Sequence, residues 1–129
     1  MKNLPLLLVM GFVCAAPFAF SQSAEEMASN CKGIVDARIV NDQIAVPSDF
    51  QSGVCWGAFG TIQTIVTIVP RSFPQNGPLF EVCLPHEGTR SQLIRIFMTY
   101  TERHPERLHE DYFFIATTAL KQAFPCGKQ

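Results

Sequence analysis

The distribution of cysteines is the feature that most constrains how this chain can fold. The sequence holds five, and the first, Cys14, falls in an apolar N-terminal stretch with the pattern of a secretory signal peptide. An even number of cysteines in the remaining exported domain indicates disulfides, with three possible connectivities, and the Cys-x2-Cys spacing of a zinc site is absent. We therefore expect two disulfides and no metal. The four cysteines involved are Cys31, Cys55, Cys83 and Cys126.

The N-terminal stretch carries a lysine at its second position and continues as an apolar run over residues 4–16. A membrane-spanning helix needs about 20 apolar residues, so this run is too short for one and fits a signal peptide. Small residues precede the expected cut after Ser21, which gives a signal peptide at 1–21 and a single domain at 22–129. Two alternatives stay open here: a retained anchor, and a lipoprotein cut at Cys14, which would follow a valine instead of a small residue.

The charge balance argues against a protein that binds nucleic acid. Ten basic and eleven acidic residues give a formal net charge of −1, whereas nucleic-acid-binding proteins usually have a clear basic excess. No second apolar run is long enough to span a bilayer, so we expect no stable membrane insertion once the signal peptide is removed. The apolar content of 47% is sufficient for a packed core.

Helix-start patterns recur three times along the chain. A Ser or Thr followed three residues later by Glu or Gln can cap a helix, because each side chain bonds the other residue's backbone N–H. Apolar residues at helical spacing follow each pattern. The three predicted helices begin after Ser23 and cover 24–32, extending towards Asp36; begin after Ser48 and end at Pro70; and begin after Thr89 and end at Arg103.

A fourth helix is predicted to begin at Pro105. Proline favours the first position of a helix, and Glu106, Glu110 and Asp111 would then lie near the positive end of the helix dipole. Apolar residues follow at helical intervals until Pro125. The short turn before Pro105 predicts that the third and fourth helices form a tight antiparallel pair.

Two stretches are expected to be mainly loop. Residues 33–47 contain Ile and Val that could form a strand, but no partner strand is evident. Residues 70–88 are interrupted by prolines and glycines and indicate a long irregular segment. Within it, Phe73, Leu79 and Phe80 need burial either in this protein or against a partner. The expected fold class is thus all-α, a single-domain bundle of about four helices with long loops.

Three glycines, Gly53, Gly57 and Gly60, fall on or near one side of the second predicted helix. Each costs about 0.5–1 kcal/mol relative to alanine in a helix, so a packing reason is expected. The simplest reason is the close approach of another helix, and a ligand groove is the alternative.

The helix order predicts which cysteines pair. In an antiparallel helix pair, the start of the first helix lies beside the end of the second. Cys83 lies shortly before the first helix of the predicted pair, and Cys126 directly follows the second. Similarly, Cys31 ends the first helix and Cys55 lies in the second turn of the next. We therefore predict the disulfides Cys31–Cys55 and Cys83–Cys126.

Patterns that would indicate catalysis are sparse. His104 and His109 are five residues apart, which does not place two ligands on one helix face. His86 has no such neighbour, and the carboxylates after Pro105 fit a solvated helix start better than an acid–base pair. No phosphate-binding loop, dinucleotide fingerprint or nucleophile motif occurs. We expect a binding protein with no catalytic residues and no cofactor, an enzyme being the less favoured reading.

One set of short motifs extends over nearly the whole exported domain and resembles a known family. In order they are Cys55-Trp56-Gly57, Cys83-Leu84-Pro85, Thr89-x-x-Gln92-Leu93, Tyr100, His104-Pro105-Glu106, Ala119-Leu120 and Phe124-Pro125-Cys126. This series resembles the Rap/Tai family of periplasmic immunity proteins, which neutralise peptidoglycan amidase effectors of the type VI secretion system. The core of the resemblance covers residues 24–126. It departs from the family pattern at Ala58, where the family has Tyr, and at Gly60, which comes one place early.

The resemblance implies an all-helical, disulfide-bonded periplasmic protein, often a homodimer, that occludes the active-site cleft of an amidase. Such an inhibitor needs a rigid scaffold, because rigidity limits the ordering cost of binding, and a projecting segment. The segment 70–88 is the candidate projection, and we predict Arg71, Phe73, Gln75 and Asn76 as partner contacts. The alternative is a periplasmic structural or binding module of similar fold that has no toxin partner.

Overall fold

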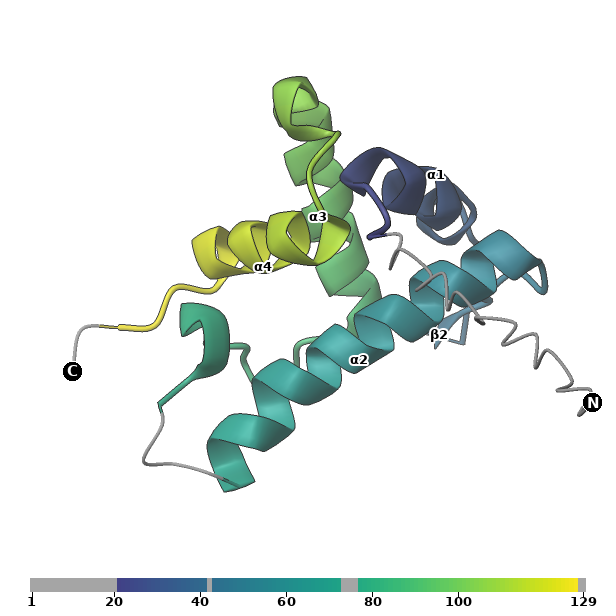
Figure 1. Cartoon of the computed structure of the whole chain (residues 1–129). Helices are drawn as coiled ribbons and strands as arrows, with labels where there is room; N and C mark the ends of the chain where they lie inside the picture. Colours follow the sequence, from purple (N-terminus) through teal and green to yellow (C-terminus); the bar gives the residue numbers. More distant parts are fainter. Residues whose placement is uncertain (1–20, 42, 73–76, 128–129) are drawn as a thin grey trace, which may run out of the picture.

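The structure, a computed structural model, describes residues 21–41, 43–72 and 77–127; for 69–72 it describes the backbone only. Four α-helices dominate this part of the chain, joined by one short hairpin and two 3-10 turns (Figure 1). The all-α prediction is confirmed. The elements are α1 (Ala24–Val35), β1 (Ile39–Val40), β2 (Gln43–Ile44), α2 (Phe50–Ser72), η2 (Leu79–Glu81), α3 (Arg90–Arg103), η3 (Pro105–Arg107) and α4 (Tyr112–Ala123).

Two of the three predicted helix starts are found where the sequence places them. The Ser23 hydroxyl accepts a hydrogen bond from the backbone N–H of Glu26, whose carboxylate accepts the N–H of Ser23 in return. Thr89 caps α3 in the same position, accepting the N–H of Gln92. Because these bonds form within four residues, they depend little on the rest of the fold.

The start and end of α2 differ from the prediction. Asp49, not Ser48, accepts the Ser52 N–H, at 2.8 Å, and the helix begins at Phe50. Asp49 also accepts the Ser52 hydroxyl, so the carboxylate satisfies two donors where a serine would satisfy one. At the other end, α2 continues two residues past Pro70. A proline removes its own N–H bond and its ring crowds the carbonyl four residues earlier, so the helix ends within one turn after Pro70 and not at Pro70 itself.

The core lies where α1 meets the other three helices. α1 packs against α2, α3 and α4, and its buried residues Met27, Cys31 and Ile34 follow the spacing of one helix face. Phe59 of α2 and Phe97 of α3 are fully buried, with ring centroids 5.3 Å apart. Burying a side chain of this size contributes about 1.5–3 kcal/mol. Because α3 also packs against the other three helices, the small core is built around α1 and α3 together.

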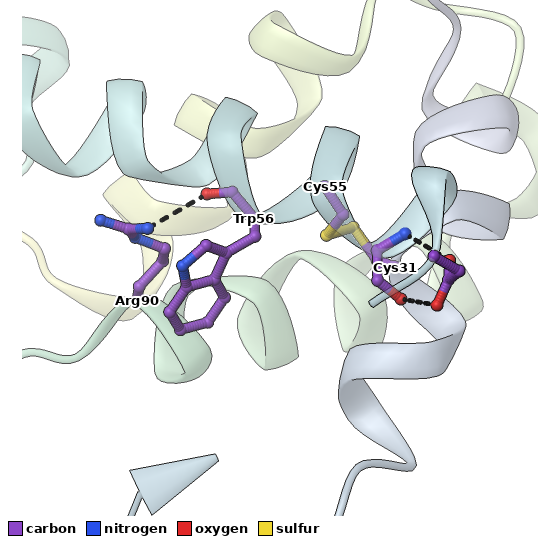
Figure 2. Close-up of a disulfide and its surroundings, with 6 residues drawn as sticks. Cys31, Cys55, Trp56 and Arg90 are labelled. Carbon is purple, nitrogen blue, oxygen red and sulfur yellow. Dashed lines mark hydrogen bonds between the residues drawn. A yellow bond between two sulfur atoms is a disulfide. The ribbon is translucent and has the colours of Figure 1, made fainter. Parts of the chain in front are cut away.

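Two disulfides fasten this core, in the pairs expected from the sequence. Cys31–Cys55 joins α1 to α2, and both cysteines are fully buried (Figure 2). Cys83–Cys126 joins the segment before α3 to the segment after α4 and lies near the surface. One crosslink is therefore part of the core and the other holds two surface segments together.

The segment predicted as loop over 33–47 has more structure than expected. α1 extends to Val35, and β1 and β2 form a two-stranded antiparallel hairpin with Ile39 opposite Ile44. The sequence showed no partner strand because both strands are only two residues long and lie within the same segment. Ile39 and Val40 remain exposed.

The fourth helix begins later than predicted, and the antiparallel pairing with α3 is wrong. α4 starts at Tyr112 with Asp111 as its N-cap, whereas Pro105 opens only a 3-10 turn. The carbonyls of Leu108 and Glu110 accept N–H groups from the first turn of α1, at 3.0 and 2.8 Å, and so are not available for a helix. This longer connection reorients the chain, and Figure 1 shows α4 running away from α3 at a steep angle.

The expected close approach of a helix to the α2 glycines is also wrong. A Cβ atom added at Gly53 or Gly57 would meet nothing within 4 Å. Only Gly60 is covered, and by a side chain: the guanidinium carbon of Arg90 would lie 2.9 Å from its Cβ. Gly60 therefore gives room to one arginine and not to a helix.

Candidate functional site

The residues predicted as partner contacts cannot be placed. Phe73, Gln75 and Asn76 lie outside the described residues, as does the side chain of Arg71. The described part of the same segment begins at Gly77 and runs to α3. Within this segment η2 contacts both α2 and α4. The candidate site is built from residues 77–88 and from α4.

The turn η2 has an unusual backbone. Phe80 and Glu81 are consecutive non-glycine residues with φ of 56° and 54°. This left-handed region costs a residue with a Cβ about 1–3 kcal/mol, and such residues persist only when the surrounding structure holds them. The sequence signals the turn through Pro78 but gives no sign of the left-handed pair. Local strain of this kind concentrates at functional sites, which makes the Phe80–Glu81 turn the first candidate.

Contacts at Val82 and Cys83 hold this turn against the segment that follows α4. Val82 forms a bridge with Pro125, and the Cys83 N–H donates to the carbonyl of Phe124 at 3.0 Å. The Cys83–Cys126 disulfide follows directly. These constraints fix the backbone immediately after Glu81.

The side chains of the turn lie on α4. Phe80 contacts Phe113 edge to face, with ring centroids 5.3 Å apart, and Glu81 forms an ion pair with Lys121. Phe80 remains 44% exposed and Phe114 55%. Together these residues line a shallow, mainly apolar hollow of about 650 Å³, here called the aromatic groove. Its walls comprise Phe80, Glu81, Asp111, Phe113, Phe114, Thr117, Thr118 and Lys121.

A partly buried ion pair supports one end of the aromatic groove. Arg107 donates to both carboxylate oxygens of Glu110, at 2.7 and 2.8 Å, and to the Tyr100 hydroxyl at 2.6 Å. This pairing raises the pKa of Arg107 above its usual range and lowers the pKa of Glu110. The guanidinium also lies 5.5 Å from the ring centroid of Phe114, so it supports this exposed ring.

Asp111 has a structural role at the start of α4. Its carboxylate accepts the hydroxyl of Ser21 and the backbone N–H groups of Phe113 and Phe114. The Ser21 hydroxyl first, and then the two N–H groups, lower the pKa of Asp111. The same causes keep the carboxylate ionised, which does not suit a proton donor near neutral pH.

A second rigid contact lies between α2 and α3. Arg90 stacks over the indole of Trp56, 4.6 Å from the ring centroid, and donates to the Trp56 carbonyl at 3.4 Å (Figure 2). Gly60 provides the space for this guanidinium. The Nε atom of Arg90 is buried without a hydrogen-bond partner among the described residues. Arg90 is the first residue of α3 and packs against α2. We therefore interpret this stack as a contact that holds the two helices together.

The histidines do not assemble into a site. His104 stacks on Tyr100, with ring centroids 4.3 Å apart, and its Nδ1 lies 3.1 Å from Glu106. His86 and His109 are exposed. Within the part of the chain that the structure describes, no cluster of three His, Cys, Asp or Glu side chains could hold a metal ion. None of the helices in the described ranges is long and apolar enough to cross a membrane.

Comparison with known proteins decides the family. The model of the family described as Rap1a immunity proteins matches residues 21–126. The chain belongs to the Rap1a immunity protein family. Rap1a immunity proteins are inhibitors rather than enzymes, and membership of the family implies that the chain binds a partner effector protein. Neither the curated proteins nor the solved structures contain a match to the chain.

Proposed function

We propose that this Rap1a protein is a periplasmic immunity protein that inhibits a peptidoglycan amidase effector of the type VI secretion system by covering its active-site cleft. The observation that carries the proposal, beyond family membership, is the strained Phe80–Glu81 turn held by a disulfide beside an exposed aromatic face. An inhibitor of this kind needs contact residues that are already in place before the partner arrives.

Preorganisation is the physical advantage of the turn. A loop that is ordered only on binding loses part of its contact energy to conformational entropy. Phe80 and Glu81 are already fixed by the Cys83–Cys126 crosslink and by the ion pair with Lys121. More of the contact energy with the effector would therefore be available as affinity.

The aromatic groove supplies the contact energy. Exposed Phe80 and Phe114 flank it, and aromatic side chains that become fully buried are among the commonest anchors of protein interfaces. The predicted contacts Arg71, Phe73, Gln75 and Asn76 precede this turn in the chain and remain part of the proposal. We place the amidase on this side of α4.

Export through a signal peptide at 1–21 forms part of the proposal. Cleavage after Ser21 would remove the Ser21 hydroxyl from Asp111 but leave Gln22, whose carbonyl accepts the Tyr112 N–H at 3.0 Å. The start of the mature domain would thus stay attached to α4. Two disulfides suit an oxidising compartment such as the periplasm.

The direct test is capture of a target followed by inhibition. The mature protein is used to pull down candidate type VI amidases, and each captured amidase is assayed for release of peptides from purified peptidoglycan with increasing amounts of the mature protein. We expect one amidase to bind and to lose its activity at equimolar protein. If every amidase tested remains fully active and unbound, the orphan-module alternative replaces this proposal. Light scattering of the mature protein tests the implied homodimer separately.

Two matched phenylalanine variants test the site. Phe80→Ala removes the aromatic side chain of the turn, whereas Phe50→Ala removes one that is 80% exposed at the start of α2, outside the aromatic groove. We expect Phe80→Ala to raise the inhibition constant at least about tenfold and Phe50→Ala to leave it unchanged. Circular dichroism checks that both variants are folded. Equal inhibition by the two variants would place the amidase elsewhere, and replacing residues 72–78 with Gly and Ser then tests the preceding segment.

A further inference from the structure

A second groove lies on the other side of α4, in the angle between α3 and α4. It has a volume of about 450 Å³, and α4 contributes Ala119, Gln122 and Ala123 to it. The aromatic groove takes Thr118 and Lys121 from the same helix. The exposed ridge of α4 therefore separates two hollows of different chemistry.

The charge in this second groove is entirely positive. Arg95 and Arg103 of α3 line it, and no Asp or Glu does. Neither arginine forms an ion pair with any residue that the structure describes. The nearby carboxylate of Glu106 is paired with Nδ1 of His104, which lines one end of the groove. The chain as a whole has a net charge of −1, so a groove lined by two guanidiniums and no carboxylate differs in charge from the protein as a whole. We call this hollow the basic groove.

The lining of the basic groove is partly apolar. Ile96 and the small side chains of Ala119 and Ala123 contribute apolar surface, so a polypeptide backbone could approach α4 closely. Gln92 and Gln122 also line the groove and can both donate and accept hydrogen bonds. Such a lining suits a peptide segment better than a compact ion, which would leave the apolar surface uncovered.

The spacing of the arginines sets the length of the segment. Arg95 and Arg103 are eight residues apart on α3, which is about 12 Å along the helix axis. An extended chain covers about 13 Å in four residues, and residues four apart point to the same side. Two acidic residues at positions i and i+4 of an extended segment would therefore each meet one guanidinium.

From these observations we propose that the basic groove binds an extended acidic segment of a partner protein, with two carboxylates four residues apart. The inference rests on the proposed function only for the identity of the protein that carries the segment. A partner seated on the aromatic groove would reach the basic groove across α4. The second contact adds charge recognition, which favours one partner over others of similar shape.

The groove itself is tested with peptides. An eight-residue peptide with Glu at positions 3 and 7 is titrated into the isotopically labelled mature protein at low salt, beside the same peptide with Gln at both positions. We expect the Glu peptide to shift the amide NMR signals of Arg95, Thr99, Arg103 and Gln122 and to bind at least about threefold more tightly than the Gln peptide. Equal binding of the two peptides, or shifts confined to other parts of the surface, would overturn the proposal.

Protein variants provide the matched control. Arg95→Gln with Arg103→Gln should remove the preference for the Glu peptide, whereas Arg38→Gln, an exposed arginine outside both grooves, should retain it. With a captured amidase, the double variant should also bind more weakly and lose part of the salt dependence of binding. If the amidase binds wild type and double variant equally at every salt concentration, the groove proposal fails while the proposed function stands. If no amidase is captured, the peptide result still decides the groove.

Discussion

The two disulfides should differ in their contribution to stability, and in the opposite order to their loop lengths. Cys83–Cys126 closes a loop of 43 residues and Cys31–Cys55 one of 24. Loop-closure entropy alone gives about 4.0 kcal/mol for the first crosslink and about 3.4 kcal/mol for the second. By chain entropy, therefore, the surface crosslink contributes more.

Local structure reverses this order. Without Cys83–Cys126, Phe80 and Glu81 can leave the left-handed region, and recovering about 1 kcal/mol from each reduces the loss to about 2 kcal/mol. Without Cys31–Cys55, no comparable strain is released, and the fully buried sulfurs lose their packing, so the loss rises to about 4–5 kcal/mol.

The measurement is urea unfolding of two double variants, Cys83→Ser/Cys126→Ser and Cys31→Ala/Cys55→Ala, beside the oxidised wild type. Serine suits the exposed pair and alanine the buried pair, since a buried hydroxyl would add its own cost. We expect loss of the buried pair to lower the free energy of unfolding by about 2–3 kcal/mol more than loss of the surface pair. An equal or larger loss for the surface pair would refute the role assigned to strain at Phe80 and Glu81.

Two further predictions concern α2 and the cap of α4. Gly57→Ala should raise the free energy of unfolding by about 0.5–1 kcal/mol, because its Cβ meets open space, whereas Gly60→Ala should gain less, since it displaces Arg90; thermal unfolding compares them. Asp111→Ala should cost about 1 kcal/mol at pH 7 through loss of the cap. In a protein that retains Ser21, the folded pKa of Asp111 is lowered, so its contribution is present above the unfolded value near 3.9 and is lost as the pH falls through the folded pKa. The difference in the free energy of unfolding between Asp111→Ala and wild type should therefore become smaller as the pH falls below about 4. A difference that stays constant over this range would contradict the prediction.

Prediction from sequence succeeded where one short segment decides the outcome. Ser23 and Thr89 cap their helices because the bonds involved span three residues. It failed where a local pattern allowed two answers: Ser48 and Asp49 could each cap α2, and the carboxylate, which accepts two donors from Ser52, does so.

The cysteine pairs show that a correct answer can come from an incomplete picture. Cys83 and Cys126 do meet, but not because α3 and α4 form an antiparallel hairpin. They meet because Val82 bridges Pro125 and the Cys83 N–H bonds Phe124. Similarly, Phe80 was recognisable as an aromatic that needed a partner surface. Its left-handed backbone was not recognisable, because the Cys83–Cys126 crosslink and the contacts with α4 impose it together.

By itself, the sequence determined the helical class, two of the helix starts, the number of crosslinks and the family, since these follow from residue types at fixed short spacings. Only the tertiary structure decided where α4 begins, because α1 takes the carbonyls of Leu108 and Glu110 from more than 80 positions away in the chain. It also decided the surfaces on both sides of α4. The aromatic and basic grooves combine residues from separate elements, and long-range packing alone brings those together.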